Sequence, residues 1–123
     1  MTIIRTALLG LALVAPLATA DDCAAPEVPQ LPDGATSTME QMLAGQKAVK
    51  AFQAANLEYM GCLEAGLNAA EQAVKSASED EQAEAQAAYD KAVDAYNTAV
   101  SREEEVAGQF NTEIREYKAA NPS

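Results

Sequence analysis

The sequence predicts an all-α protein: an antiparallel two-helix hairpin of the coiled-coil type, residues 38–123, preceded by a polyproline-type strip, residues 21–37, that a disulfide tethers to it. Three observations lead to this fold class. Alanine makes up 28 of the 123 residues and favours helix. No proline occurs between residues 33 and 121, and larger apolar residues recur at helical spacing in two stretches, about 38–77 and 79–118. Because alanine buries little area, we expect a thin core.

Residues 1–20 have the three parts of a secretory signal peptide. Arg5 supplies a positive charge, residues 7–18 are mostly apolar, and small residues precede an expected cleavage site after Ala20. The apolar part is shorter than the roughly 20 residues of a membrane span. A buried N-terminal helix is the alternative. We expect a mature chain, residues 21–123, that is soluble, periplasmic or secreted, and not inserted in a membrane.

The charge of the chain excludes several functions. Nineteen acidic and eight basic side chains give a formal net charge of −11, which becomes −12 once Arg5 leaves with the signal peptide. Such a chain lacks the positive groove that binds nucleic acid and the basic patch that binds anionic membranes. It also lacks histidine, the commonest general base and nitrogen ligand. We expect no enzymatic activity, no catalytic residue, no cofactor and no metal ligands.

Cys23 and Cys62 are expected to form a disulfide, since an even pair in an exported protein is typical of one. Two free thiols are the alternative. Prolines at positions 26, 29 and 32 suit a polyproline II strip, with a turn at Pro-Asp-Gly, residues 32–34. Folded back along the first helix, such a strip is long enough to bring the two cysteines together. The bond would close a loop of about 40 residues, worth roughly 3–4 kcal/mol. A proline motif for a partner's aromatic groove is the other interpretation of the strip.

The first helix is predicted from a capping motif and one apolar stripe. Residues 37–40, Ser-Thr-Met-Glu, match the Ser-x-x-Glu capping box, so the helix should begin near Thr38. The stripe has larger apolar members and small or polar ones. They are Met42, Val49, Phe52, Tyr59, Leu63, Leu67 and Val74, with Gly45, Asn56, Gly66, Ala70 and Ala73 between them.

The second helix is predicted from two heptad series offset by three residues. The first is Val93, Val100, Ala107 and Ile114, and the second is Tyr89, Tyr96, Glu103, Phe110 and Tyr117. Glu103 is the misfit, and it suits either a solvated edge or a residue that sets oligomer register. Three acids at residues 79–81 suit the start of the helix, and Asn121 with the proline after it suits its end.

A hairpin and one continuous helix of about 80 residues are both compatible with the absence of glycine and proline near residue 77. The two apolar series slip by two residues there, and residues 78–81 form a second Ser-x-x-Glu motif, which favours the hairpin. Closing it near Ser78 makes residues face each other when their numbers sum to about 155. Four pairs of oppositely charged residues then match: Glu40 with Arg115, Lys50 with Glu105, Glu64 with Lys91, and Lys75 with Glu81.

Several residue groups are candidate sites by composition, but a structural interpretation of each is favoured. The acidic runs 79–81 and 103–105 suit helix ends or solvated faces better than Ca²⁺, and Asp90 with Asp94 lack a pocket. The methionines suit gap filling better than Cu(I), and the tyrosines suit the core edge. Gly61, Gly66 and Gly108 suit close approach of the strip or of a helix. These methionines and tyrosines are Met39, Met42, Met60, Tyr59, Tyr89, Tyr96 and Tyr117.

Four segments resemble small exported α-helical proteins of Gram-negative bacteria that have a Cys/Pro-rich N-terminal strip. The segments are residues 23–34, CAAPEVPQLPDG; 42–50, MLAGQKAVK; 59–63, YMGCL; and 110–118, FNTEIREYK. This resemblance implies a periplasmic setting and supplies no activity and no site residues.

Together these features predict a non-enzymatic binding or structural module of the bacterial envelope. We expect a protein partner or self-association, because two alanine-rich helices leave apolar faces uncovered. The alternative is an acidic inhibitor or chaperone-like protein that binds a basic exported protein. A carboxylate-based enzyme or a cation-binding protein is less favoured.

Overall fold

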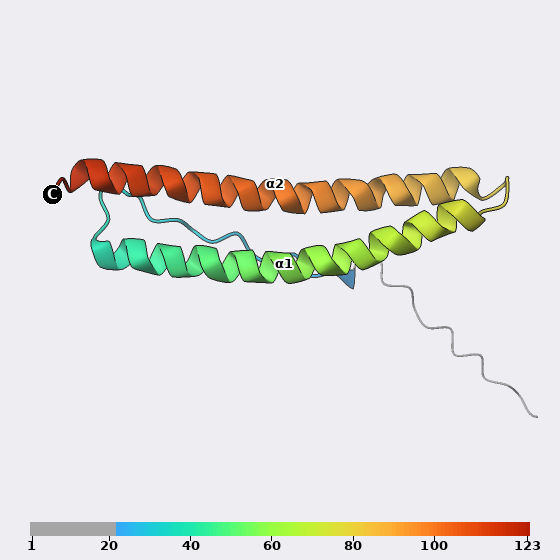
Figure 1. Ribbon diagram of the computed structural model, residues 1–123, viewed down its shortest axis with the longest axis horizontal. Coiled ribbons are helices and arrows are strands. Elements are labelled where there is room, and N and C mark those ends of the chain that lie inside the picture. The colour runs from blue at the N-terminus through green and yellow to red at the C-terminus, as the bar shows by residue number, and fades with distance from the viewer. Residues whose placement is uncertain (1–21) are drawn as a thin grey trace, which may run out of the picture.

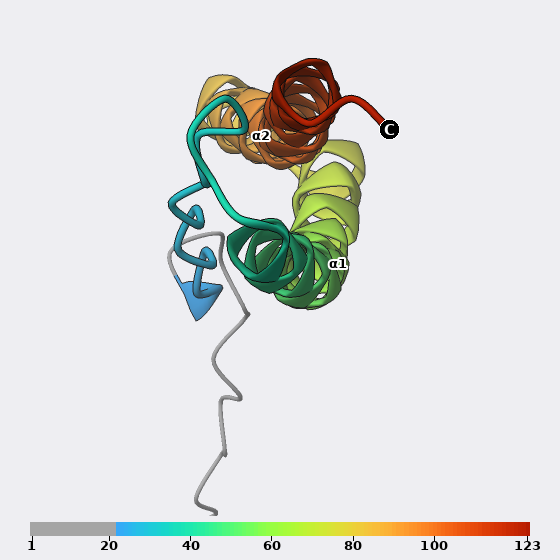
Figure 2. The same cartoon turned by 90° about the vertical axis from the view of Figure 1, so that its left-hand side faces the viewer.

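A computed structural model describes residues 22–123 and confirms the predicted fold class. Two helices, α1 (Met39–Ser76) and α2 (Gln82–Ala120), pack against each other as an antiparallel hairpin (Figure 1). The strip that precedes α1 lies along one side of the helix pair (Figure 2). Among the described residues there is no strand, and neither helix is long and apolar enough to cross a membrane. The predicted signal peptide, residues 1–20, lies outside them.

The cap of α1 lies one residue later than predicted. Thr38, not Ser37, is the N-cap: its Oγ1 accepts from the Gln41 backbone N–H, and its own N–H donates to Gln41 Oε1 at 2.8 Å. The sequence permits both registers, because residues 37–40 and 38–41 both match a capping box. The preceding turn decides between them. The Ser37 N–H already donates to the Asp33 carbonyl, so it is not available for a reciprocal cap.

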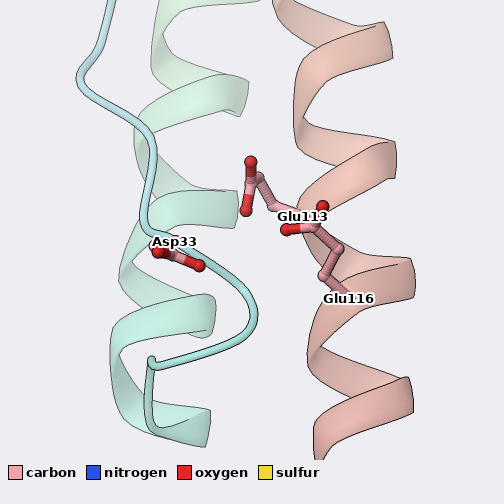
Figure 3. Close-up of side chains that lie close together, drawn as sticks. All are labelled: Asp33, Glu113 and Glu116. Atoms are coloured by element: carbon pink, nitrogen blue, oxygen red, sulfur yellow. The ribbon is translucent and has the colours of Figure 1, made fainter.

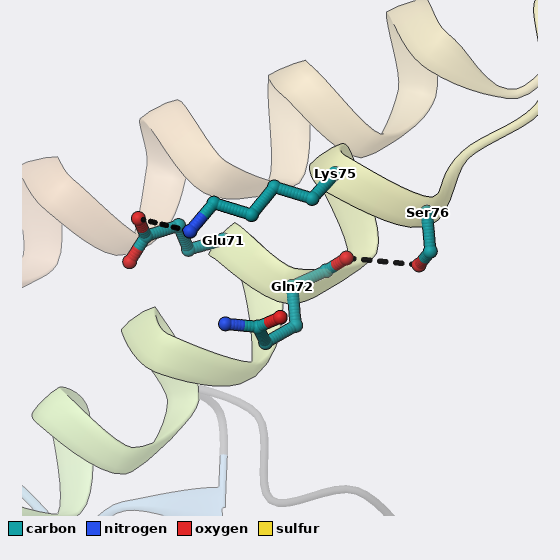
Figure 4. Close-up of polar contacts among 4 residues, drawn as sticks. All are labelled: Glu71, Gln72, Lys75 and Ser76. Carbon is teal, nitrogen blue, oxygen red and sulfur yellow. Dashed lines mark hydrogen bonds and ion pairs between the residues drawn. The ribbon is translucent and has the colours of Figure 1, made fainter.

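The connection between the helices is a short turn, which corrects the predicted start of the second helix from residue 79 to Gln82. Helix α1 ends at Ser76, whose hydroxyl donates to the Gln72 carbonyl (Figure 4). The Glu81 N–H donates to the Ser78 carbonyl, and the Ser78 N–H donates to Glu81 Oε2 at 3.4 Å. In a complete capping box the Ser78 hydroxyl would accept the bond from the Glu81 N–H, but the Ser78 carbonyl accepts it instead. Only the bond from the Ser78 N–H to the Glu81 side chain therefore forms, and residues 79–81 make the turn.

The thin core lies along the helix interface and largely follows the predicted stripes. In α1 the predicted stripe supplies the buried side chains, which are Met42, Val49, Phe52, Asn56 and Leu63. In α2 the buried line differs from the first heptad series. Ala99 and Val106 are buried, whereas Val100 and Ala107, one residue later, are half-buried beside them. Helix α2 therefore faces α1 along the line of Ala99, Val106 and Phe110, and the first predicted series lies to one side of this line.

The predicted register is confirmed by contacts across the interface. Gly45 lies against the Phe110 ring, and Asn56 Nδ2 donates to the Ala99 carbonyl at 3.1 Å. The numbers of both pairs sum to 155. None of the four predicted cross-helix ion pairs forms, however, and Lys75 pairs instead with Glu71 on its own helix at 3.1 Å (Figure 4). The predicted partners are all solvent-exposed, where an ion pair gains too little to hold two long side chains together.

The strip is fixed at both ends. Near its start, the predicted disulfide joins Cys23 to Cys62, with 5.8 Å between the Cα atoms. Every third residue from Cys23 through the three prolines is half-buried, which is the period of a polyproline II helix lying on a surface. Near its end, Pro32 lies so close to Gly45 that a Cβ there would come within 2.7 Å of the proline ring. The strip therefore packs on the protein's own helices.

Candidate functional site

The turn between strip and α1 docks on the last turns of α2. The Asp33 carbonyl and carboxylate accept bonds from the three residues that follow Gly34, and the Gly34 N–H donates to Glu113 Oε2 at 2.6 Å. Gly34 is buried with a negative φ, so its role is steric. A Cβ at this position would overlap the Glu113 backbone and lie 2.9 Å from the Tyr117 nitrogen. Glycine thus allows the turn to touch the helix backbone.

This docking brings together an acidic cluster, which we define as Asp33, Glu113 and Glu116. One carboxylate oxygen from each lies within 4.8 Å of the others, and the three side chains point toward the space between the turn and α2 (Figure 3). The negative charge of Glu113 is the main reason that the pKa of Glu116 is raised from 4.5. Desolvation, a hydrogen bond to Glu113 and the charge of Asp33 act in the same direction, and Arg115 opposes them.

The acidic cluster was not among the predicted candidate residues. The predicted register could have located it. Pairs whose residue numbers sum to 155 place the start of α1 beside residues 113–116, and the turn at Asp33 directly precedes α1. Chemically, three carboxylates can attract a hard cation, but Ca²⁺ takes six or more oxygens. Asp33 and Glu116 are also exposed, so the cluster by itself resembles an ordinary acidic surface.

The acidic residues that were singled out from the sequence are not brought together into a site. Residues 79–81 are exposed in the turn between the helices, and Glu104 and Glu105 are exposed on α2. Asp90 and Asp94 are exposed as well, and Asp90 accepts a bond from Gln86 Nε2 at 2.9 Å. In residues 22–123 these carboxylates therefore agree with the solvated-face interpretation.

Glu103 has a role that neither sequence interpretation anticipated. It is half-buried, and its Oε2 accepts from Asn56 Nδ2 at 3.2 Å across the helix interface. Asn56, only 1% exposed, also approaches the sulfur of Met60 at 3.6 Å. The misfit in the heptad series is thus the acceptor for a buried amide in the same chain, rather than a solvated edge or a contact between chains.

The predicted glycine roles are partly wrong. A Cβ at Gly61 or Gly108 would meet nothing within 4 Å, so neither glycine serves close approach of the strip or of the partner helix. Gly34 and Gly45 serve it instead. The tyrosines of both helices are half-buried, as expected for the core edge. Of the methionines, Met42 is buried and Met60 half-buried, whereas Met39 is 56% exposed and fills no gap in the interface.

A groove of about 360 Å³ lies between the helices at the open end of the hairpin. Its walls include Met39 and Leu43 of α1, each 56% exposed, and Ile114 of α2. No residue of the strip lines it, because the strip packs on the other flank of α1, beside Ala44 and Ala48. The strip lies along one side of the helix pair (Figure 2), and the groove is on the side that the strip leaves uncovered.

The apolar character of this side continues past the groove. Leu57 is 69% exposed and lies 18 residues, or five helical turns, beyond Met39, so the two share one line along α1. From Ile114, the first heptad series runs along α2 with every member only half-buried. We call this side the bare face. It comprises Met39, Leu43, Lys50, Leu57 and Glu64 of α1 and Val93, Val100, Ala107 and Ile114 of α2.

The geometry of the hairpin thus offers one acidic cluster under the strip and one apolar face away from it. Only the second combines exposed apolar side chains with a groove. Comparisons of the chain with protein-family models, with curated proteins and with solved structures found no match.

Proposed function

We propose that this chain is an exported, non-enzymatic helical module that binds a protein or serves a structural role in the bacterial envelope. Two features support the export of the chain. The first 20 residues carry the signal-peptide pattern, and the tether between strip and helix is a disulfide, a bond that persists in oxidising compartments outside the cytosol.

The observation that carries the binding role is the bare face. Three large apolar side chains, Met39, Leu43 and Leu57, are more than half exposed on one side of α1. On a small protein with little apolar surface to spare, an exposed apolar face that continues into a groove is typical of an interaction site. The exposed methionine of the groove, Met39, suits the role, because its flexible side chain adapts to a partner's surface.

The rest of the architecture supports presentation of this face. A two-helix hairpin alone is marginally stable, and a tether that closes a loop of about 40 residues removes entropy from its unfolded state. The strip covers the opposite side of the pair and leaves the bare face free. The strip and the disulfide therefore stabilise the hairpin from the side opposite the bare face.

The test is crosslinking in the periplasm of the exporting cells, with the mature, oxidised chain as bait. We expect a crosslinked species that is lost in the Leu43→Glu and Leu57→Glu variants. Val28→Glu is the matched control, since Val28 is also exposed, at 48%, but lies on the strip. Capture that is insensitive to the bare-face variants contradicts the proposal. Capture that ignores them and weakens steeply with salt indicates instead the acidic inhibitor or chaperone-like alternative.

A further inference from the structure

Two charged residues of the bare face lie at equal distances on either side of its most exposed apolar residue. Lys50 precedes Leu57 by seven residues and Glu64 follows it by seven, which puts each charge about 10 Å from Leu57 along the same helix face. Both side chains are exposed, and within residues 22–123 neither forms an ion pair. Lys50 and Glu64 are about 21 Å apart along α1, so they cannot meet in one chain.

Such an arrangement is self-complementary in one orientation. If a second copy of α1 lies antiparallel on the first with the two Leu57 side chains together, Lys50 of each copy falls beside Glu64 of the other. A parallel pairing would instead place lysine on lysine and glutamate on glutamate. It would also bring the two acidic turns, residues 79–81, to the same end, whereas the antiparallel pairing separates them.

We propose that the partner of the bare face is a second copy of this chain, packed antiparallel with Leu57 at the two-fold axis and Lys50 of each copy paired with Glu64 of the other. This inference rests on the proposed binding role and names its partner. The interface is isologous, as in most homodimers, and the result is a four-helix bundle with a strip on each outer side.

The size of the face suits a stable dimer. Helix α1 has 38 residues and so extends about 57 Å, and the half-buried first heptad series of α2 runs beside it. A standard interface buries roughly 800 Å² per partner, an area that a face of this length and two helices' width supplies. The exposed leucines and the half-buried valines provide its apolar centre.

The experiment is analytical ultracentrifugation of the mature, oxidised chain over a wide concentration range. We expect a reversible dimer. Leu57→Glu should make the chain monomeric without loss of helicity, because Leu57 packs on nothing in the monomer core. Lys50→Glu and Glu64→Lys should each weaken dimerisation roughly tenfold or more. The double variant Lys50→Glu/Glu64→Lys should restore it, since both pairs are then reversed. Lys91→Glu, which makes the same charge change off the bare face, is the matched control.

Three results would overturn the inference: a monomer at all concentrations, a dimer unaffected by Leu57→Glu, or charge swaps whose combination restores nothing. Its failure is separable from that of the proposed function. A monomer that still crosslinks to another protein through Leu43 and Leu57 rejects the second copy and keeps the binding role. A monomer without any capture that depends on this face rejects both.

Discussion

Asn56 of α1 donates a hydrogen bond from Nδ2 to Glu103 of α2, over 3.2 Å, and so joins the buried amide of one helix to the acidic misfit of the other. The same amide donates to the Ala99 carbonyl at 3.1 Å. A sliding of the helices by one turn would leave the amide buried without an acceptor, at a cost of about 1–3 kcal/mol. The contact therefore specifies register in an interface whose other buried side chains are all apolar and carry no directional bonds.

Replacing Asn56 by aspartate tests this contact. The change keeps the shape but puts a buried carboxylate where an amide donated to Ala99 and to Glu103. The new carboxylate would then face the Ala99 carbonyl and the negatively charged Glu103 side chain, with no donor from either. We therefore expect the free energy of unfolding to fall by roughly 3 kcal/mol at neutral pH. Urea denaturation followed by circular dichroism measures this loss. Combining the change with Glu103→Gln, which restores a donor, should recover part of it, and an unchanged loss in the double variant would contradict the assignment.

The disulfide should dominate the stability of this small core. Its 39-residue separation predicts a loss of about 3–4 kcal/mol when the bond is removed. The variant Cys23→Ser/Cys62→Ser and the reduced natural chain should therefore unfold at the same, lower urea concentration. Reductant should not change the double variant further. If the oxidised and reduced chains unfold at equal urea concentrations, the tether does not brace the hairpin.

Replacing a glycine by alanine should destabilise the protein where the glycine is in close contact with another segment and stabilise it where the glycine lies in an open helical position. Gly34→Ala pushes a Cβ into the backbone of Glu113 and Tyr117, so we expect a loss of roughly 1–3 kcal/mol as the turn lifts from α2. Gly61→Ala and Gly108→Ala are the controls, because both sites are helical and open. There alanine should stabilise by up to about 1 kcal/mol. Thermal unfolding of the three variants compares them, and destabilisation at all three would show that the distinction is wrong.

The predictable part of the fold is what local patterns specify. The apolar stripe of α1 and the register sum of 155 follow from spacing, because helix geometry fixes which residues share a face. The Cys23–Cys62 bond follows from an even pair of cysteines and from a strip long enough to join them. Details that depend on competition between neighbouring groups do not follow. Ser37 and Thr38 both offered a cap, and only the Asp33 turn, which occupies the Ser37 N–H, decides between them.

The candidate sites show the same limit more strongly. The acidic cluster joins residues about 80 positions apart and depends on how closely Gly34 approaches α2, which a pattern of single letters does not encode. The cross-helix ion pairs were predicted from register alone. Register places two residues at the same height but leaves exposed side chains free to point to water, where pairing gains under about 1 kcal/mol. Asn56 and Glu103 form a hydrogen bond because the buried Asn56 amide cannot donate to solvent water instead.

The acidic cluster should make stability depend on pH with a definite sign. Because the pKa of Glu116 in the folded chain is raised above its ordinary 4.5, chiefly by the charge of Glu113, the folded state holds this proton more tightly than the unfolded state. Stability should therefore rise as the pH falls from neutral through the raised pKa toward 4.5. Glu116→Gln, which mimics the protonated form, should unfold at a higher temperature than the natural chain at pH 7, and this advantage should vanish near pH 4.5.

Glu104→Gln removes the same charge from an exposed site on α2 and controls for the general acidity of the chain. Thermal melts of the three chains at several pH values give the answer. If Glu116→Gln gains no more than Glu104→Gln at pH 7, the three carboxylates do not repel one another in solution, and the turn at Gly34 docks on α2 without opposing charge.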